Sequence, residues 1–211
     1  MKKYKVYLFD FDGTLFDTRP ALQMVFKKSY EHEGVTVSDE QCQIFSREPI
    51  NIGYEALIGG SEDDFWEWVK VINYYLNGEE SVSLSLLFDD TREVHERLSK
   101  MEGIQYGIVT SNNIPHCKDI YNYHHIDISH MSVLVGNHEC IIPKPDPAPI
   151  NTALKMLNYQ GNLHDVVYIG DALNDAIAGI NAGVDVLLLD RENIYQNSGY
   201  PTIHSLLEIF D

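Results

Sequence analysis

The sequence is poor in cysteine, in positive charge and in long hydrophobic runs, and each shortage excludes a class of protein. Its three cysteines, Cys42, Cys117 and Cys140, show no CxxC spacing, which favours free thiols in a reducing compartment over a disulfide framework. No apolar run approaches the roughly 20 residues that span a bilayer, and the stretch behind the N-terminal lysines is interrupted by Asp10. We therefore expect a cytoplasmic protein without a membrane partner.

The shortage of positive charge narrows the choice of ligands. The chain has 15 Lys+Arg against 32 Asp+Glu, a formal net charge of -17. Such an acidic surface repels nucleic-acid phosphates and anionic lipids, so we expect no nucleic-acid partner. A negatively charged substrate would need a local cation in order to approach.

The apolar residues that are present indicate an α/β fold. Several short runs hardly alternate with polar residues, as in strands buried on both faces of a sheet. These strands are expected at 4–9, 104–110, 165–170 and 184–189, with a weaker candidate at 131–136. Helical periodicity lies between them, at 90–102, 147–159 and 174–183, the last with Asn174 as a possible cap and Gly183 at its end. The alternation predicts a doubly wound parallel sheet with helices on both faces.

Residues 17–87 break this alternation. They contain successive helical patterns and no strand of the buried type, and the aromatic run at 65–76 reads mostly as the core of that part. We therefore predict a catalytic core formed by residues 1–16 and 88–211, with a helical domain inserted at 17–87. An insert at this point follows the first strand and would sit above the carboxyl end of that strand.

Acidic and hydroxyl residues follow three of the expected strands. Ligands of open parallel sheets bind beyond the carboxyl ends of the strands, so these residues should meet at one edge. They are Asp10 and Asp12 after the first strand, Thr110 and Ser111 after the second, and Asp171 and Asp175 after the strand at 165–170. Carboxylates packed together repel one another unless a cation lies among them. Mg²⁺, which prefers oxygen ligands, is the most plausible one.

A phosphate group is the natural substrate for such an edge. Lys144, between two prolines that stiffen its loop, would neutralise further charge. One aspartate could attack phosphorus while a second handles the protons, and Asp10 and Asp12 suit that division because a single residue separates them. Gly13 would let the chain turn tightly enough for both to face one ligand.

Four segments resemble, in order, the motifs of the haloacid dehalogenase superfamily. They are "DFDGTL" (10–15), "GIVTSN" (107–112), "KPDP" (144–147) and "GDALND" (170–175). Their order and spacing extend the resemblance over nearly the whole chain. The helical insert resembles the α-helical cap of this family, and the chain looks most similar to the group of phosphoglycolate phosphatases.

The resemblance implies a role for each matching residue. Thr110 would bind the transferring phosphoryl group, helped by Ser111 and Asn112. Lys144 would hold the nucleophile and the phosphate together. Asp10 would be both the nucleophile and a metal ligand. Asp12 would be the general acid and base, and its backbone carbonyl would also bind the metal. Asp171 would be a further ligand, and Asp175 would either bind the metal or support a residue that does.

The resemblance also implies an activity. Asp12 favours phosphoryl transfer over dehalogenation, because an alkoxide leaving group needs a proton and a halide does not. We therefore expect a Mg²⁺-dependent phosphatase that hydrolyses a small phosphorylated metabolite, of the phosphoglycolate or sugar-phosphate type, through an aspartyl-phosphate. A sugar phosphomutase and a non-catalytic binding or regulatory protein are the alternatives. The sequence is compatible with a monomer or a small homo-oligomer.

Two further features carry weaker expectations. Arg47 lies in "SREPINIGYEAL", where relatives with a cap contribute to the substrate pocket, although a surface salt bridge is an equal alternative. Histidines and cysteines recur between residues 116 and 140 without the paired spacing of a zinc site. We interpret them as surface histidines on a loop-rich segment.

Overall fold

The computed structural model describes residues 2–45 and 50–211, which form two units. One unit consists of Met1–Asp17 and Leu87–Asp211, and the other of Thr18–Leu86. Short strands β2 (Phe16–Asp17) and β3 (Leu86–Leu87) pair as a separate two-stranded sheet where the chain passes between the units. Within the described residues, no helix combines the length and the apolar character that a membrane span requires.

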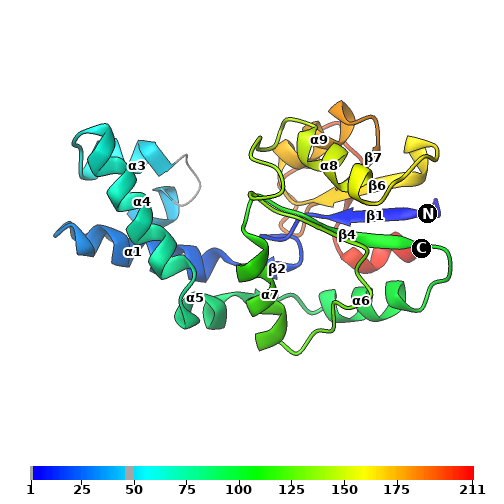
Figure 1. The fold of residues 1–211 in the computed structure, drawn as a ribbon, viewed down its shortest axis with the longest axis horizontal. Coiled ribbons are helices and arrows are strands. Elements are labelled where there is room, and N and C mark those ends of the chain that lie inside the picture. The colour runs from blue at the N-terminus through cyan, green and yellow to red at the C-terminus, as the bar shows by residue number, and fades with distance from the viewer. Residues whose placement is uncertain (1, 46–49) are drawn as a thin grey trace. The chain divides into compact units, whose positions relative to one another are not determined.

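The first unit is built on a six-stranded parallel sheet, shown in Figure 1. The strand order places β1 in the middle, with later strands added first on one side and then on the other. This reversal is a topological switch point, where open sheets of this kind form a crevice beyond the strand ends. In sheet order the strands are β5 (Val133–Val135), β4 (Gln105–Val109), β1 (Val6–Phe9), β6 (Val166–Gly170), β7 (Asp185–Leu189) and β8 (Thr202–Ile203).

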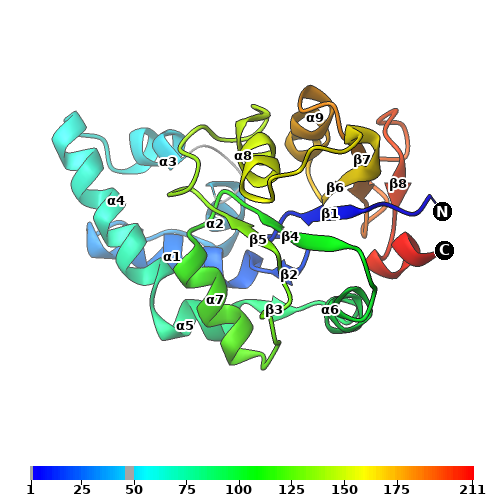
Figure 2. The same ribbon diagram turned by 45° about the vertical axis from the view of Figure 1, so that its right-hand side comes forward.

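Helices cover both faces of this sheet, as Figures 1 and 2 show. One face carries α8 (Ala148–Met156) and α9 (Leu173–Asn181), and the other carries α6 (Thr91–Ser99) and α7 (Ile114–Tyr123). All four residues of β1 are buried, as expected of a strand covered on both sides. The predicted α/β fold with a doubly wound parallel sheet is confirmed.

The second unit is helical and has its own core. Trp68 is the centre of this core, because its ring is fully buried and its Nε1 donates to the carbonyl of Ser29 at 3.1 Å. Ser61 begins the longest helix with a capping box in which it exchanges hydrogen bonds with Asp64. The helices are α1 (Arg19–His32), α2 (Asp39–Phe45), α3 (Ile50–Leu57), α4 (Glu62–Leu76) and α5 (Glu79–Leu84).

Two local expectations need correction. The segment at 116–140 is loop-rich only beyond residue 123, because Asn113 caps helix α7 by accepting from the N–H of His116. His116 is buried, whereas His125, His130 and His138 are exposed as expected. Helix α9 begins at Leu173, so Asn174 does not cap it. Instead the carboxylate of Asp175 accepts from the N–H of Ala172, at 3.0 Å, from inside the first turn.

Candidate active site

The first site residue follows directly from the sheet. Asp10 stands at the carboxyl end of β1, where its N–H donates to the carbonyl of Ile169 in β6 at 2.8 Å. The chain then turns sharply, because the N–H groups of Leu15 and Phe16 both donate to the carbonyl of Phe11. This turn returns the backbone beside the end of β6, so residues 11–16 stay at the switch point.

Two glycines make room for carboxylates at this edge. Gly13 has a φ of +78°, which favours glycine, and a Cβ there would lie 2.1 Å from Oδ2 of Asp171. Gly170 has no such φ, but a Cβ at this position would lie 2.3 Å from the carboxyl carbon of Asp175, so the glycine leaves the space that this side chain fills. The acids therefore pack directly against backbone, which no other residue type at 13 or 170 would permit.

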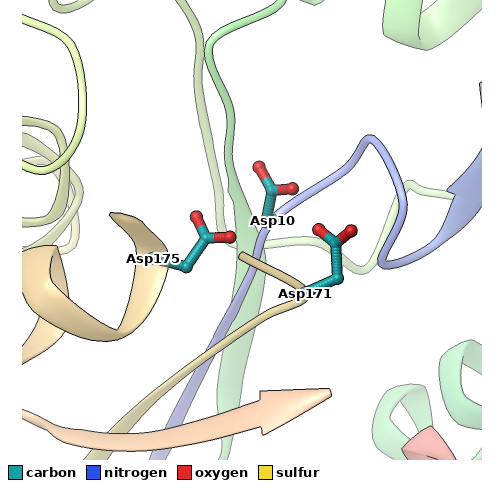
Figure 3. A group of neighbouring side chains, drawn as sticks. All are labelled: Asp10, Asp171 and Asp175. Atoms are coloured by element: carbon teal, nitrogen blue, oxygen red, sulfur yellow. The ribbon is translucent and has the colours of Figure 1, made fainter. Parts of the chain in front are cut away.

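Three carboxylates converge at this point. Asp10, Asp171 and Asp175 each offer an oxygen, and these oxygens lie within 4.8 Å of one another. In Figure 3, Asp10 comes from the end of β1, Asp171 from the loop after β6 and Asp175 from helix α9. Thr14, which is fully buried, donates its hydroxyl to Oδ1 of Asp171 at 3.4 Å.

Lys144 holds two of these acids. Its Nζ donates to Oδ1 of Asp10 and to Oδ1 of Asp175, both at 2.6 Å, and all three side chains are less than a tenth exposed. Its third donor reaches the hydroxyl of Tyr168 at 3.0 Å. An ammonium has three N–H donors, so all of those of Lys144 are used within the protein. Its geometry is that of a group which orients Asp10.

Tyr168 is the site residue that sequence reasoning missed. It lies in the middle of β6 and is fully buried, with its hydroxyl 2.9 Å from the carbonyl of Val109 and 3.1 Å from Oδ1 of Asp175. In the sequence it is one aromatic residue within an apolar strand, so no local pattern distinguishes it from core. Only the position of Lys144 above it gives the hydroxyl a role.

Burial sets the protonation of the site. It raises the pKa of Asp10 well above its usual range, with repulsion from the neighbouring carboxylates acting in the same direction and Lys144 opposing them. Burial, followed by repulsion from Asp175, raises the pKa of Asp171 to about 7. Burial alone would lower the pKa of Lys144, but Asp10 and the other partners raise it well above its ordinary value. The ammonium therefore remains charged.

Asp12 faces the end of a different strand. Thr110, which directly follows β4, donates its hydroxyl to Oδ2 of Asp12 at 3.4 Å. The side-chain amide of Asn112 lies 3.3 and 3.4 Å from the two oxygens of the same carboxylate. The N–H of Asn112 also donates to the Thr110 hydroxyl at 3.0 Å. These contacts orient Asp12, whereas Ser111 between them is exposed.

The structure thus brings together most of the residues that the sequence singled out. Asp10, Asp171, Asp175 and Lys144 form one cluster, and Asp12, Thr110 and Asn112 form a second beside it. Arg47 lies outside the described residues.

The donor set fits a hard divalent cation. Mg²⁺ prefers carboxylate oxygens, and three carboxylates from two segments distant in the sequence converge here. Lys144 uses one oxygen of Asp10 and one of Asp175, which leaves the other oxygen of each free of that ammonium. A cation there would relieve the repulsion that raises the pKa of Asp10 and of Asp171, and would displace protons from them.

Comparison with known proteins identifies similar chains. The family model described as "Haloacid dehalogenase-like hydrolase" matches residues 7–189. The phosphoglycolate phosphatase of Colwellia psychrerythraea is 26% identical, over 88% of this chain and 84% of its own. Pyrophosphatase PpaX of Bacillus velezensis is 27% identical, over 86% and 81%. The structure of a haloacid dehalogenase-like family hydrolase from Streptococcus pneumoniae superposes with a TM-score of 0.78 at 20% identity, covering 100% of this chain and 98% of that one.

Proposed function

The chain belongs to the haloacid dehalogenase-like hydrolase family, and we propose that it is a Mg²⁺-dependent phosphatase acting on a small phosphorylated metabolite. The observation that carries this proposal is the convergence of Asp10, Asp171 and Asp175 on one point, with Lys144 bonded to Asp10. A second acid, Asp12, lies beside this point and has its own hydrogen-bond partners. Phosphoglycolate and pyrophosphate are the substrates that the names of the relatives support, and a sugar phosphate would suit the same site chemistry.

In the proposed first step, a carboxylate oxygen of Asp10 attacks phosphorus. The bond between phosphorus and the leaving-group oxygen breaks, and Asp12 donates a proton to that oxygen. The product is an aspartyl-phosphate on Asp10 and a free alcohol. Lys144 keeps the attacking carboxylate in place, and the Thr110 hydroxyl stabilises the transferring group.

In the second step, water replaces Asp10 on phosphorus. Asp12, now ionised, takes a proton from the water as it attacks. The bond between phosphorus and Asp10 breaks, which releases inorganic phosphate, restores the Asp10 carboxylate and leaves Asp12 protonated for the next cycle. The same residue thus acts first as acid and then as base.

Asp10, Asp171 and Asp175 would hold the metal ion, together with the backbone carbonyl of Asp12. A bound Mg²⁺ neutralises charge on the phosphoryl oxygens and allows an anion into an acidic protein. The helical domain at 17–87 would be the cap that closes over the substrate and excludes water while Asp10 is phosphorylated. Arg47 in that domain remains a proposed contact to the substrate.

Hydrolysis of p-nitrophenyl phosphate by the purified chain tests the proposal. With Mg²⁺ we expect turnover, and with excess EDTA we expect almost none, because the carboxylates then repel the phosphate. Activity should return when Mg²⁺ is added back beyond the EDTA. Equal hydrolysis with and without EDTA would contradict the proposal. A panel of phosphoglycolate, sugar phosphates and pyrophosphate, ranked by kcat/KM, then identifies the substrate.

Lys144→Met should lower kcat by about a hundredfold or more, because the orientation of Asp10 and the charge beside it are both lost. Tyr168→Phe removes the third partner of the ammonium together with the contacts to the Val109 carbonyl and Asp175. It leaves Lys144 bonded to both acids, so it should lower kcat by only about two- to tenfold. Steady-state kinetics with p-nitrophenyl phosphate measure both. If Tyr168→Phe matched Lys144→Met, the hydroxyl would be more than a support. If Lys144→Met kept normal kcat, Lys144 would have no catalytic role.

A further inference from the structure

An ion pair outside the site joins the loop after β7 to the start of α6. Arg191 donates from both terminal nitrogens to the two oxygens of Asp90, at 3.0 and 2.8 Å. The side chain of Asp90 is 8% exposed and that of Arg191 is 21% exposed. The guanidinium also lies 4.1 Å from the centre of the Phe88 ring. A paired, stacked arginine of this kind is held in a single orientation.

Both carboxylate oxygens of Asp90 are held by hydrogen bonds within the protein. It occupies the N-cap position of α6, yet its carboxylate makes no capping bond to that helix. It accepts instead from the hydroxyl of Ser205 at 2.7 Å and from the N–H of Leu206 at 2.8 Å. Although burial acts to raise the pKa of Asp90, the hydrogen bonds from Arg191 and Ser205 outweigh it and lower that pKa. The carboxylate is therefore a fixed, charged anchor for Arg191.

The anchored arginine reaches the turn that carries the acids. Arg191 donates to the carbonyl of Thr14 at 3.1 Å. The Thr91 hydroxyl donates to the next carbonyl along the chain, that of Leu15, at 2.7 Å. The hydroxyl of the same Thr14 points to Asp171, and the adjacent Gly13 leaves the space for that carboxylate. Any shift of the Thr14 carbonyl therefore changes the room available to Asp171.

We propose that Arg191 and Asp90 are positioning residues, which fix the turn at residues 11–16 so that Asp171 is held in place to bind the cation. Neither residue touches the metal ligands directly, and no sequence motif includes them. The inference rests on the metal site of the proposed function, but it is independent of whether the chain hydrolyses phosphates. The alternative is a pair that only joins two segments and adds stability.

Direct binding of Mn²⁺, measured by electron paramagnetic resonance, separates these alternatives without using activity. Arg191→Lys keeps the charge but cannot reach both oxygens of Asp90 and the Thr14 carbonyl at once. Asp90→Asn keeps the shape and removes the charge. We expect each to raise the Kd for Mn²⁺ about tenfold, as loss of support around a metal ligand does.

Two control variants complete the experiment. Arg92→Lys alters an arginine that likewise donates to two carbonyls, those of His124 and His125, away from the site. Leu98→Ala removes a buried side chain of α6 and lowers stability without touching the turn. Both should bind Mn²⁺ like the unaltered chain.

Normal Mn²⁺ affinity in Arg191→Lys and Asp90→Asn would overturn the inference, and so would an equal loss in Leu98→Ala, since stability alone would then explain it. Should Arg191→Lys fail to fold, Asp90→Asn decides the question by itself. A chain that binds Mn²⁺ but does not hydrolyse p-nitrophenyl phosphate would refute the proposed function and leave this inference intact.

Discussion

Asp10→Asn is expected to lower kcat for p-nitrophenyl phosphate by about 10³-fold or more, because an amide oxygen is a far poorer nucleophile than a carboxylate. The substitution also removes a negative charge that the metal site and Lys144 share. The size of the side chain is unchanged, so the buried position remains filled. Steady-state kinetics at saturating Mg²⁺ measure the loss.

A second measurement ties this loss to covalent chemistry. Acid quenching during turnover of ³²P-labelled substrate should trap a phosphorylated chain in the unaltered protein and none in Asp10→Asn. The matched control is Asp165→Asn, which alters an aspartate at the opposite end of β6 that pairs with the exposed Lys5. It should retain both activity and trapping. Labelled phosphate on the Asp10→Asn chain would assign the nucleophile to another residue.

Asp12→Asn is expected to lower kcat by about 10²- to 10⁴-fold for an alkyl phosphate such as phosphoglycolate. The loss in cleaving the ester bond should be smaller for p-nitrophenyl phosphate, because p-nitrophenolate leaves without a proton whereas an alkoxide does not. Asn112 and Thr110 can still bond to the new amide, so the local structure should persist. Single-turnover kinetics measure cleavage of the ester bond alone. The loss with the alkyl phosphate divided by the loss with p-nitrophenyl phosphate is therefore a direct measure of general-acid catalysis.

Two results would contradict this role for Asp12. Equal single-turnover losses on both substrates would mean that Asp12 acts through the metal or through structure and does not donate the proton. The decay of the phosphoenzyme is followed by acid quenching at successive times after unlabelled substrate is added, and an unchanged decay rate in Asp12→Asn would mean that Asp12 does not activate water in the second step. Asn112→Asp, which replaces the neighbouring donor by a like charge, should weaken activity on both substrates by comparable factors.

Much of the core could be predicted because its signals are local in the sequence. The buried strands are short apolar runs, and three of them end in acidic or hydroxyl residues at the same edge, so Asp10, Thr110 and Asp171 could be grouped from the order of residues alone. Helix α7 could not be assigned this way. His116 and the polar residues that follow it obscured the apolar face that buries Ile120 and Tyr121.

The sequence by itself determined the fold class and the candidate nucleophile, acid and metal ligands, because these depend on hydrophobic periodicity and on motifs only a few residues long. Tertiary structure alone decided how they are supported. Lys144 uses its third donor on Tyr168, and Arg191 reaches Thr14 from 177 residues away along the chain. The physical reason is that a hydrogen bond requires its two atoms to lie within about 3 Å of each other in space. Residues far apart in the sequence reach that distance only through the folded chain path, and no local sequence pattern predicts which of them will meet.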